Sequence, residues 1–212
     1  FFNLFILTSL DDKEILKDGE LNILMIDVGQ GDAILVYFPD GKTALIDAGE
    51  ASPFFDNGER IILPLIDYLD IEKIDYAFVS HLDADHYGGF ISLVLKEKIG
   101  EIIKPKTDSL LSKDLKFESF LKRFEVPFSF YSKKCFRVGE VSLYFLNDEN
   151  DKLYSGLSTN DKSGIIKLVY GNTSFLFTGD IESKAEKYYS EKYRGFLKSD
   201  VLKVAHHGSH TS

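Results

Sequence analysis

Four potential metal ligands fall within six residues of this chain, and they are His81, Asp83, Asp85 and His86. They follow an apolar run at residues 76–79 that predicts a buried strand, and Gly88-Gly89 and a predicted helix from Phe90 come after them. A strand that ends in a ligand-bearing loop and feeds a helix is where α/β proteins usually place their chemistry. Along an extended segment, His81 and Asp83 can share one ion, and the adjacent Asp85 and His86 can turn towards a second.

The distribution of histidine argues against an acidic surface turn with two incidental histidines. All five histidines of the 212 residues lie in two clusters: His81 and His86 in the first, and His206, His207 and His210 in the second. Histidines used only for packing would be scattered along the chain. Because imidazole and carboxylate together are typical ligands of divalent transition metals, the pattern predicts a metal site.

Further ligand-type side chains stand just past other predicted strands. These are Asp47 in Asp-Ala-Gly after residues 43–46, Asp180 in Thr-Gly-Asp after residues 173–177, and His206-His207 after residues 201–205. Groups that converge from separate strand ends on one sheet edge are hard to explain as a surface accident. Gly29-Gln30-Gly31-Asp32 lacks the sequel of a phosphate loop, so it is either a tight turn with Asp32 facing the site or a simple hairpin turn.

The rest of the chain predicts a mixed α/β domain. Strands are expected at 21–28, 33–38, 43–46, 76–79, 102–103, 128–131, 141–146, 164–170, 173–177 and 201–205, the first three antiparallel, and helices at 60–69, 90–98, 108–124 and 181–192. Asp108 or Ser109 is the expected cap of the third helix. The lone Cys135 is expected to be a buried structural thiol. The polar stretch at 147–163 has the length of a functional loop.

The net charge and the first residues of the chain bear on its binding partners and on whether it is part of a longer protein. The formal net charge of −9 opposes broad electrostatic binding to nucleic acid, although part of it belongs to the proposed metal site. No segment approaches the 18 apolar residues of a membrane span. Residues 1–7 are apolar, with neither an initiator Met nor the basic start of a signal peptide, so we interpret the chain as a piece of a longer protein. Residues 1–20 are then an N-terminal extension and linker, and residues 21–212 are the domain.

Taken in order, these motifs resemble the metallo-β-lactamase superfamily. The resemblance covers about Leu21 to Ser212 and rests on Asp47-Ala48-Gly49, His81-x-Asp83-x-Asp85-His86-x-Gly88-Gly89, Thr178-Gly179-Asp180 and His206-His207-Gly208-Ser209. It implies a four-layer αββα sandwich with two metal ions at one edge of its sheets. That fold normally continues with a further strand and helix, so either the chain is truncated or its tail is not represented.

A narrower resemblance points to the soluble domain of ComEC-type competence proteins, which are DNA-uptake channels. It rests on Asp27-Val28-Gly29-Gln30-Gly31-Asp32-Ala33 and on Leu202-Lys203-Val204-Ala205-His206-His207-Gly208-Ser209. It implies a membrane-attached protein whose soluble domain is extracytoplasmic, with the channel portion in the same polypeptide. In that family the domain is thought to be a metal-dependent nuclease that degrades the non-transforming strand. Phosphorylcholine esterases share a similar motif set, so the motifs define the site better than the substrate.

The chain departs from the superfamily pattern at two positions. Asp83 stands where a histidine is usual, and no histidine lies between His86 and His206, where the family usually has one more ligand. Asn160, Asp161 or Ser163 are the candidate replacements. The carboxylate-rich ligand set is more typical of phosphoesterases than of β-lactam hydrolysis.

The resemblance implies the following roles. His81 and Asp83 bind one ion, Asp85, His86 and one of the paired histidines bind the other, and Asp180 bridges them; we favour His207 over His206 as the ligand. A hydroxide activated by both metals attacks phosphorus, and His206 donates to the phosphoryl oxygen or to the leaving group. Asp85, Asp180 and His206 are thus assigned to catalysis, and Asp32, Asp47 and Ser209 to support of the ligands. Mixed imidazole and carboxylate ligation suits Zn²⁺ or Mn²⁺, and also admits Fe²⁺.

Three functions remain open. The first is a metal-dependent phosphodiesterase or nuclease acting on DNA, expected to be single-stranded, without a nucleotide cofactor. The second is a phosphoesterase acting on a small or cell-envelope substrate, which the acidic composition favours. The third is a non-catalytic domain that guides DNA or a partner to the channel.

Overall fold

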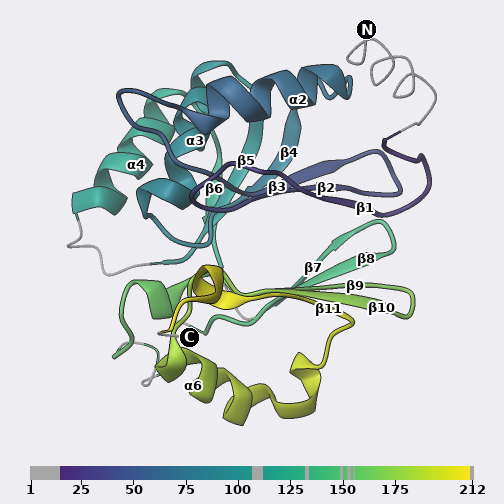
Figure 1. Ribbon diagram of the computed structural model, residues 1–212, viewed down its shortest axis with the longest axis vertical. Helices are drawn as coiled ribbons and strands as arrows, with labels where there is room; N and C mark the ends of the chain where they lie inside the picture. Colours follow the sequence, from purple (N-terminus) through teal and green to yellow (C-terminus); the bar gives the residue numbers. More distant parts are fainter. Residues whose placement is uncertain are drawn as a thin grey trace, which may run out of the picture.

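Two β-sheets lie face to face, and helices cover the outer side of each, which gives four layers (Figure 1). The computed structural model describes residues 15–106, 112–131, 134–148, 150–151, 154 and 156–210. The expectations for the apolar start at Phe1–Leu7 and for a cap at Asp108 or Ser109 lie outside the described residues. This αββα arrangement is the predicted fold class.

The first sheet is formed by the N-terminal half of the chain. Its strands, in spatial order, are β1 (Asn22–Met25), β2 (Ala33–Tyr37), β3 (Thr43–Ala48), β4 (Ile74–Phe78), β5 (Ile99–Lys104) and β6 (Phe128–Phe130). The three opening strands pair antiparallel, as predicted, and β3 to β6 pair parallel. Because β3 and β4 run parallel, the residues that follow each of them lie at the same edge of this sheet.

The second sheet is formed by the C-terminal half. Its spatial order is β11 (Val201–Lys203), β10 (Thr173–Phe177), β9 (Ile166–Tyr170), β8 (Val141–Phe145) and β7 (Lys134–Val138). The predicted hairpin of β9 and β10 turns at Gly171, which has a φ of 56°. Strand β11 pairs parallel with β10, so the residues after both strands emerge at the same edge.

Helices of the two halves pack on opposite outer faces (Figure 1). The first sheet carries η1 (Gly58–Ile62), α2 (Leu63–Tyr68), α3 (Ala84–Leu95) and α4 (Ser112–Arg123), and the second carries α6 (Ser183–Tyr193). Short helical turns are η2 (Asn160–Lys162), η3 (Arg194–Leu197) and η4 (Ala205–Gly208). No helix within the described ranges is long and apolar enough to cross a membrane.

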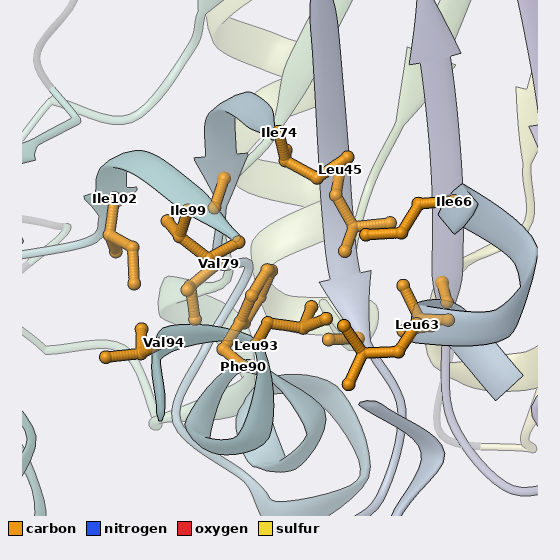
Figure 2. Packing of buried hydrophobic residues seen from close by; sticks show 14 of the residues in the cluster. Leu45, Leu63, Ile66, Ile74, Val79, Phe90, Leu93, Val94, Ile99 and Ile102 are labelled. Atoms are coloured by element: carbon orange, nitrogen blue, oxygen red, sulfur yellow. The ribbon is translucent and has the colours of Figure 1, made fainter. Parts of the chain in front are cut away.

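Three apolar clusters hold the layers together. Between the sheets, Phe78 and Phe145 have ring centroids 5.6 Å apart, and both side chains are buried. Outside the first sheet, Phe90 and Leu93 of α3 pack towards Val79 (Figure 2). Fully burying side chains of this size stabilises the fold by about 1.5–3 kcal/mol each. The third cluster lies between the second sheet and α6.

Helix α3 begins six residues earlier than predicted. Gly88-Gly89 was expected to form a loop before a helix from Phe90, but both glycines lie within α3. A Cβ atom at Gly88 would lie 2.3 Å from the backbone nitrogen of Ala51, and one at Gly89 would lie 2.1 Å from the carbonyl oxygen of Ala48. The glycines therefore allow close backbone packing, and Asp85 and His86 lie in the first turn of the helix.

The structure also corrects the prediction for Cys135. Strand β7, which the sequence did not predict, contains this residue, and its side chain is exposed instead of buried. Side chains alternate along a strand, and Cys135 lies on the face opposite to Phe136 and Val138, which pack into the cluster between the sheets.

Candidate metal centre

The candidate site lies where strand ends of the two sheets meet. In the first sheet, Asp47 lies near the end of β3 and His81 follows β4. In the second sheet, Asp180 follows β10 and His207 follows β11. The ligand atoms of His81, His86 and Asp180 all lie within 4.8 Å of one another. The two halves of the chain therefore contribute side chains to a single cluster.

His86 is at the centre of this cluster and is completely buried. Its Nδ1 lies 2.9 Å from Oδ2 of Asp47, and its Nε2 lies 3.1 Å from Oδ2 of Asp180. Burial alone would lower the pKa of His86, but the two carboxylates raise the pKa to about 10. Burial would likewise raise the pKa of Asp180, yet His86 holds it well below its usual range. The protonated His86 therefore lies between two carboxylates, in a position that would also suit a metal cation.

Asp47 and Ser80 contact the Nδ1 atoms of the site histidines. The second carboxylate oxygen of Asp47 accepts a hydrogen bond of 2.7 Å from the backbone N–H of Ser80. The Ser80 hydroxyl lies 3.1 Å from Nδ1 of His81 and 3.3 Å from Nδ1 of His86. Partners on the Nδ1 atoms fix the ring orientations and leave both Nε2 atoms directed to the site, as around known metal-binding histidines.

Four overlapping sets of three residues have ligand atoms that all lie within 4.8 Å of one another. They are His81, His86 and Asp180; Asp85, His86 and His207; Asp32, Asp180 and His207; and Asp32, Asp47 and His86. The second set contains the three residues expected to bind the second ion.

Asp32 approaches the site because its turn packs directly on α3. A Cβ atom at Gly31, which has a φ of 101°, would lie 1.9 Å from the carbonyl oxygen of Asp85. Only glycine permits this approach. The carboxylate of Asp32 lies 3.7 Å from Nδ1 of His207. Burial raises the pKa of Asp32 although the ammonium of Lys203 nearby acts in the opposite direction.

Two predicted functional residues lie beside these sets but in none of them. Asp83 is 39% exposed; its Oδ2 lies 3.6 Å from Nε2 of His81, and its Oδ1 pairs with Lys113 at 3.2 Å. Proximity to His81, and then to Lys113, holds the pKa of Asp83 well below its usual range although partial burial opposes this. His206 has its Nδ1 3.5 Å from the carboxylate of Glu182.

The turn after β11 is strained in a way that separates the paired histidines. His206 and His207 have φ values of 45° and 53°, in the left-handed region that costs most residues about 1–3 kcal/mol. His207 consequently reaches Asp180, with Nε2 3.3 Å from Oδ2, while His206 turns to Glu182. The backbone N–H of Ser209 donates to the carbonyl of His206 and closes the turn.

The candidates for the additional ligand have different positions. Asp161 accepts hydrogen bonds from the backbone N–H groups of Glu182, at 2.9 Å, and Ala185, at 3.4 Å, at the start of α6. The hydroxyl of Ser163 accepts one from the backbone N–H of Asp180. Asn160 lines a pocket next to His81. Within the described part of the chain, Asp161 belongs to none of the sets formed by histidine and carboxylate side chains.

Lys203 is a site residue that the sequence reasoning missed. Its ammonium contacts Asp32, donates to the carbonyl of Gly179 at 3.1 Å and lies 3.6 Å from Oδ1 of Asp180. The side chain is only 9% exposed. No local signal marks it, because a lysine between the apolar Leu202 and Val204 predicts an exposed lysine, whereas in the structure Leu202 and Val204 are the exposed residues.

The residues present fit divalent metal ions. Among the described side chains, Oδ1 of Asp180 is buried and has no hydrogen-bond partner, which is costly for a carboxylate. This oxygen belongs to a cluster of imidazole and carboxylate groups without thiolate, a donor set that transition-metal ions prefer.

Comparison with known proteins gives a consistent family assignment. Residues 26–212 match the metallo-beta-lactamase superfamily. ComE operon protein 3 of Bacillus subtilis is 28% identical over 206 residues, which cover 91% of this chain and 26% of that protein. Competence protein ComA of Neisseria gonorrhoeae is 28% identical over 199 residues, 94% of this chain and 25% of that protein. The chain therefore spans about a quarter of the length of these curated relatives.

Solved structures share the fold at low sequence identity. The metallo-beta-lactamase fold protein YhfI from Bacillus subtilis has a TM-score of 0.57 at 16% identity, covering 86% of this chain and 68% of that one. CmlA, a diiron beta-hydroxylase from Streptomyces venezuelae, has a TM-score of 0.56 at 16% identity, covering 89% and 35%. The expected αββα sandwich and the resemblance to competence proteins are both confirmed.

Proposed function

The chain belongs to the metallo-beta-lactamase superfamily, and from this membership we propose that it is a metal-dependent phosphodiesterase that degrades DNA during DNA uptake. The superfamily fold binds divalent metal ions, often two, and its members are usually hydrolases. The competence names of two relatives support the DNA-uptake context. The observation that carries the proposal is the convergence of His81, His86 and Asp180, with a buried oxygen of Asp180 that accepts no hydrogen bond from the described residues.

Each ligand has a defined place in this proposal. His81 and Asp83 would hold one ion, Asp85, His86 and His207 would hold the other, and Asp180 would be a ligand shared by both. The metal ions are Zn²⁺ or Mn²⁺, with Fe²⁺ also compatible. When bound, two such ions supply an activated water and stabilise the attacking and leaving oxygens of a phosphodiester.

The protein's own groups supply orientation and a proton. Asp47 and Ser80 fix the rings of His81 and His86 through their Nδ1 atoms. Glu182 beside Nδ1 of His206 keeps that imidazole at the rim of the site. In this position His206 can protonate the leaving oxygen, a contribution that typically increases rates by about 10²–10⁴-fold.

The wider context is part of the same proposal. The substrate is single-stranded DNA, and no nucleotide cofactor is required. Residues 1–20 connect the domain to a membrane channel in the same polypeptide, and the domain lies outside the cytoplasm. The similarity to competence proteins, of whose length this chain spans about a quarter, supports the DNA-uptake part of this context.

The net charge of −9 favours a second candidate, a phosphoesterase acting on a small or cell-envelope substrate. A small ester needs no extended cationic surface, whereas DNA gains much of its affinity from phosphate contacts. A domain that binds DNA without cleaving it is the third candidate.

One experiment separates the three candidates. The chelated protein is supplied with Mn²⁺ or Zn²⁺ and assayed on labelled single-stranded DNA and on bis-p-nitrophenyl phosphate. The proposal is supported if both substrates are cleaved in a metal-dependent way by the wild type. This activity should be lost in Asp180→Ala and retained in Asp67→Ala, a control at an exposed carboxylate. Cleavage of the small ester alone favours the second candidate. DNA binding by metal-loaded protein without cleavage favours the third.

A further inference from the structure

A pocket of about 610 Å³ opens beside the candidate metal centre, and the function proposed above does not use it. The first half of the chain lines it with His81 and Asp83, and the second half with residues 158–160, Lys162 and Glu182. Leu82 and Pro105 add apolar surface. This volume lies within the range of about 300–1,000 Å³ that is usual for small-molecule sites.

Two of the three acidic side chains of the pocket have cationic partners. Asp114 pairs with the buried Lys104 at 2.8 Å, and Asp83 pairs with Lys113 at 3.2 Å. Glu182 lies 3.5 Å from His206. The pocket is therefore less acidic than the net charge of the chain suggests, and an anion can enter it.

Two lysines and a group of hydrogen-bonding side chains face this space. Lys113 lies in the first turn of α4 with a side chain 65% exposed, and Lys162 lines the pocket from the second half of the chain. Ser158, Thr159 and Asn160 supply hydroxyl and amide groups next to Lys162. Ammonium groups with hydroxyl and amide donors are the usual contacts of nucleic-acid phosphates.

We propose that this pocket binds the nucleotide on the leaving-group side of the scissile phosphodiester, with Lys113 and Lys162 contacting the next phosphate. The side is assigned through Glu182, which lines the pocket and lies beside His206, the proposed proton donor to the leaving oxygen. The apolar surface of Leu82 and Pro105 faces the sugar and base. This inference rests on the proposed function and extends it, because it makes a flanking phosphate part of the substrate.

The pairing of Lys113 with Asp83 links the pocket to the metal centre. Oδ2 of Asp83 faces His81 and would take the ion, whereas Lys113 pairs with Oδ1. The exposed Lys113 can therefore contact a phosphate of the substrate while it stays beside Asp83, with or without the ion. The preference for a flanking phosphate is consequently expected to depend on both lysines.

The test compares two thymidylate substrates under activating metal. TpT contains one phosphate, whereas pTpTp adds a flanking phosphate on each side. We expect a higher kcat/KM for pTpTp, and we expect Lys113→Ala and Lys162→Ala each to reduce that preference about fivefold. The matched controls are Lys116→Ala, an exposed lysine on the same helix as Lys113, and Lys187→Ala on α6, which keep the preference.

A binding measurement in EDTA makes the inference independent of turnover. Anisotropy of a fluorescein-labelled oligothymidylate should give weaker binding in both pocket variants, with a salt dependence smaller by about 0.7 per ammonium lost. If the variants keep the wild-type preference and affinity, or if the wild-type chain binds no oligothymidylate, the inference is overturned. If binding depends on the two lysines but no phosphodiester is cleaved, the proposed catalysis fails while the pocket assignment stands.

Discussion

Nδ1 of His86 lies 2.9 Å from Oδ2 of Asp47, and both side chains are buried. Asp47 reaches this position from the end of β3 through a left-handed φ of 57°. Its other oxygen accepts from the N–H of Ser80, the residue before His81. One carboxylate thus orients the two histidines of the first sheet.

Replacing Asp47 by Asn should weaken metal binding about 10–100-fold, because outer partners of ligating histidines typically have effects of this size. Competition with a chromophoric chelator measures the affinity. Asp67→Asn, at an exposed carboxylate on α2, is the control and should bind metal like the wild type. Wild-type affinity in Asp47→Asn would exclude the orienting role.

The metal-free protein should lose stability as the pH rises from about 6.5 to 10. The folded-state pKa of His86 is raised to about 10, above the value of 6.5 expected in the unfolded chain. The stabilisation is complete below pH 6.5 and is lost as the pH rises through 10. It amounts to about 5 kcal/mol, because the pKa rises from 6.5 to about 10 and each pKa unit corresponds to roughly 1.4 kcal/mol. Urea unfolding in EDTA measures this decline, and Asp47→Asn, which removes one carboxylate, should flatten it; an unchanged slope in that variant would contradict the assignment.

Gly89→Ala should destabilise the fold by about 2–3 kcal/mol or more, because the new Cβ would lie 2.1 Å from the carbonyl oxygen of Ala48. Thermal unfolding measures the loss. Gly195→Ala is the matched control, since its Cβ would have no neighbour within 4 Å, and it should change stability by less than about 0.5 kcal/mol. Equal stability of the two variants would mean that α3 does not pack this closely.

Asp161→Ala should cost about 0.5–2 kcal/mol of stability, because it removes the acceptor of two N–H groups at the start of α6. Metal content, measured by mass spectrometry of the dialysed protein, should be unchanged. Loss of an ion from this variant would instead identify Asp161 as the additional ligand. Asp161→Asn, which keeps one acceptor oxygen, should recover most of the stability.

The sequence predicted the fold and the location of the site because ligand-type residues follow strands with clear apolar patterns. The start of α3 was not predicted, because Gly88-Gly89 favours a loop unless the close approach of Ala48 and Ala51 is known. Lys203 was missed for a related reason. Its contacts with Asp32 and Asp180 come from turns far away in the sequence, and a local pattern contains no information about them.

The division of the ligands between the two sheets has a consequence for synthesis of the protein. The first sheet is complete at Phe130 and contributes His81 and His86, whereas Asp180 and His207 come only after β10 and β11. A nascent chain that has left the ribosome as far as the first sheet holds an imidazole pair but neither of the later ligands. Proteolytic fragments ending before Asp180 share that deficiency. The ability to bind an ion across the sheets is therefore acquired only after the residues that follow β11 have been synthesised, and it is a property of both halves together.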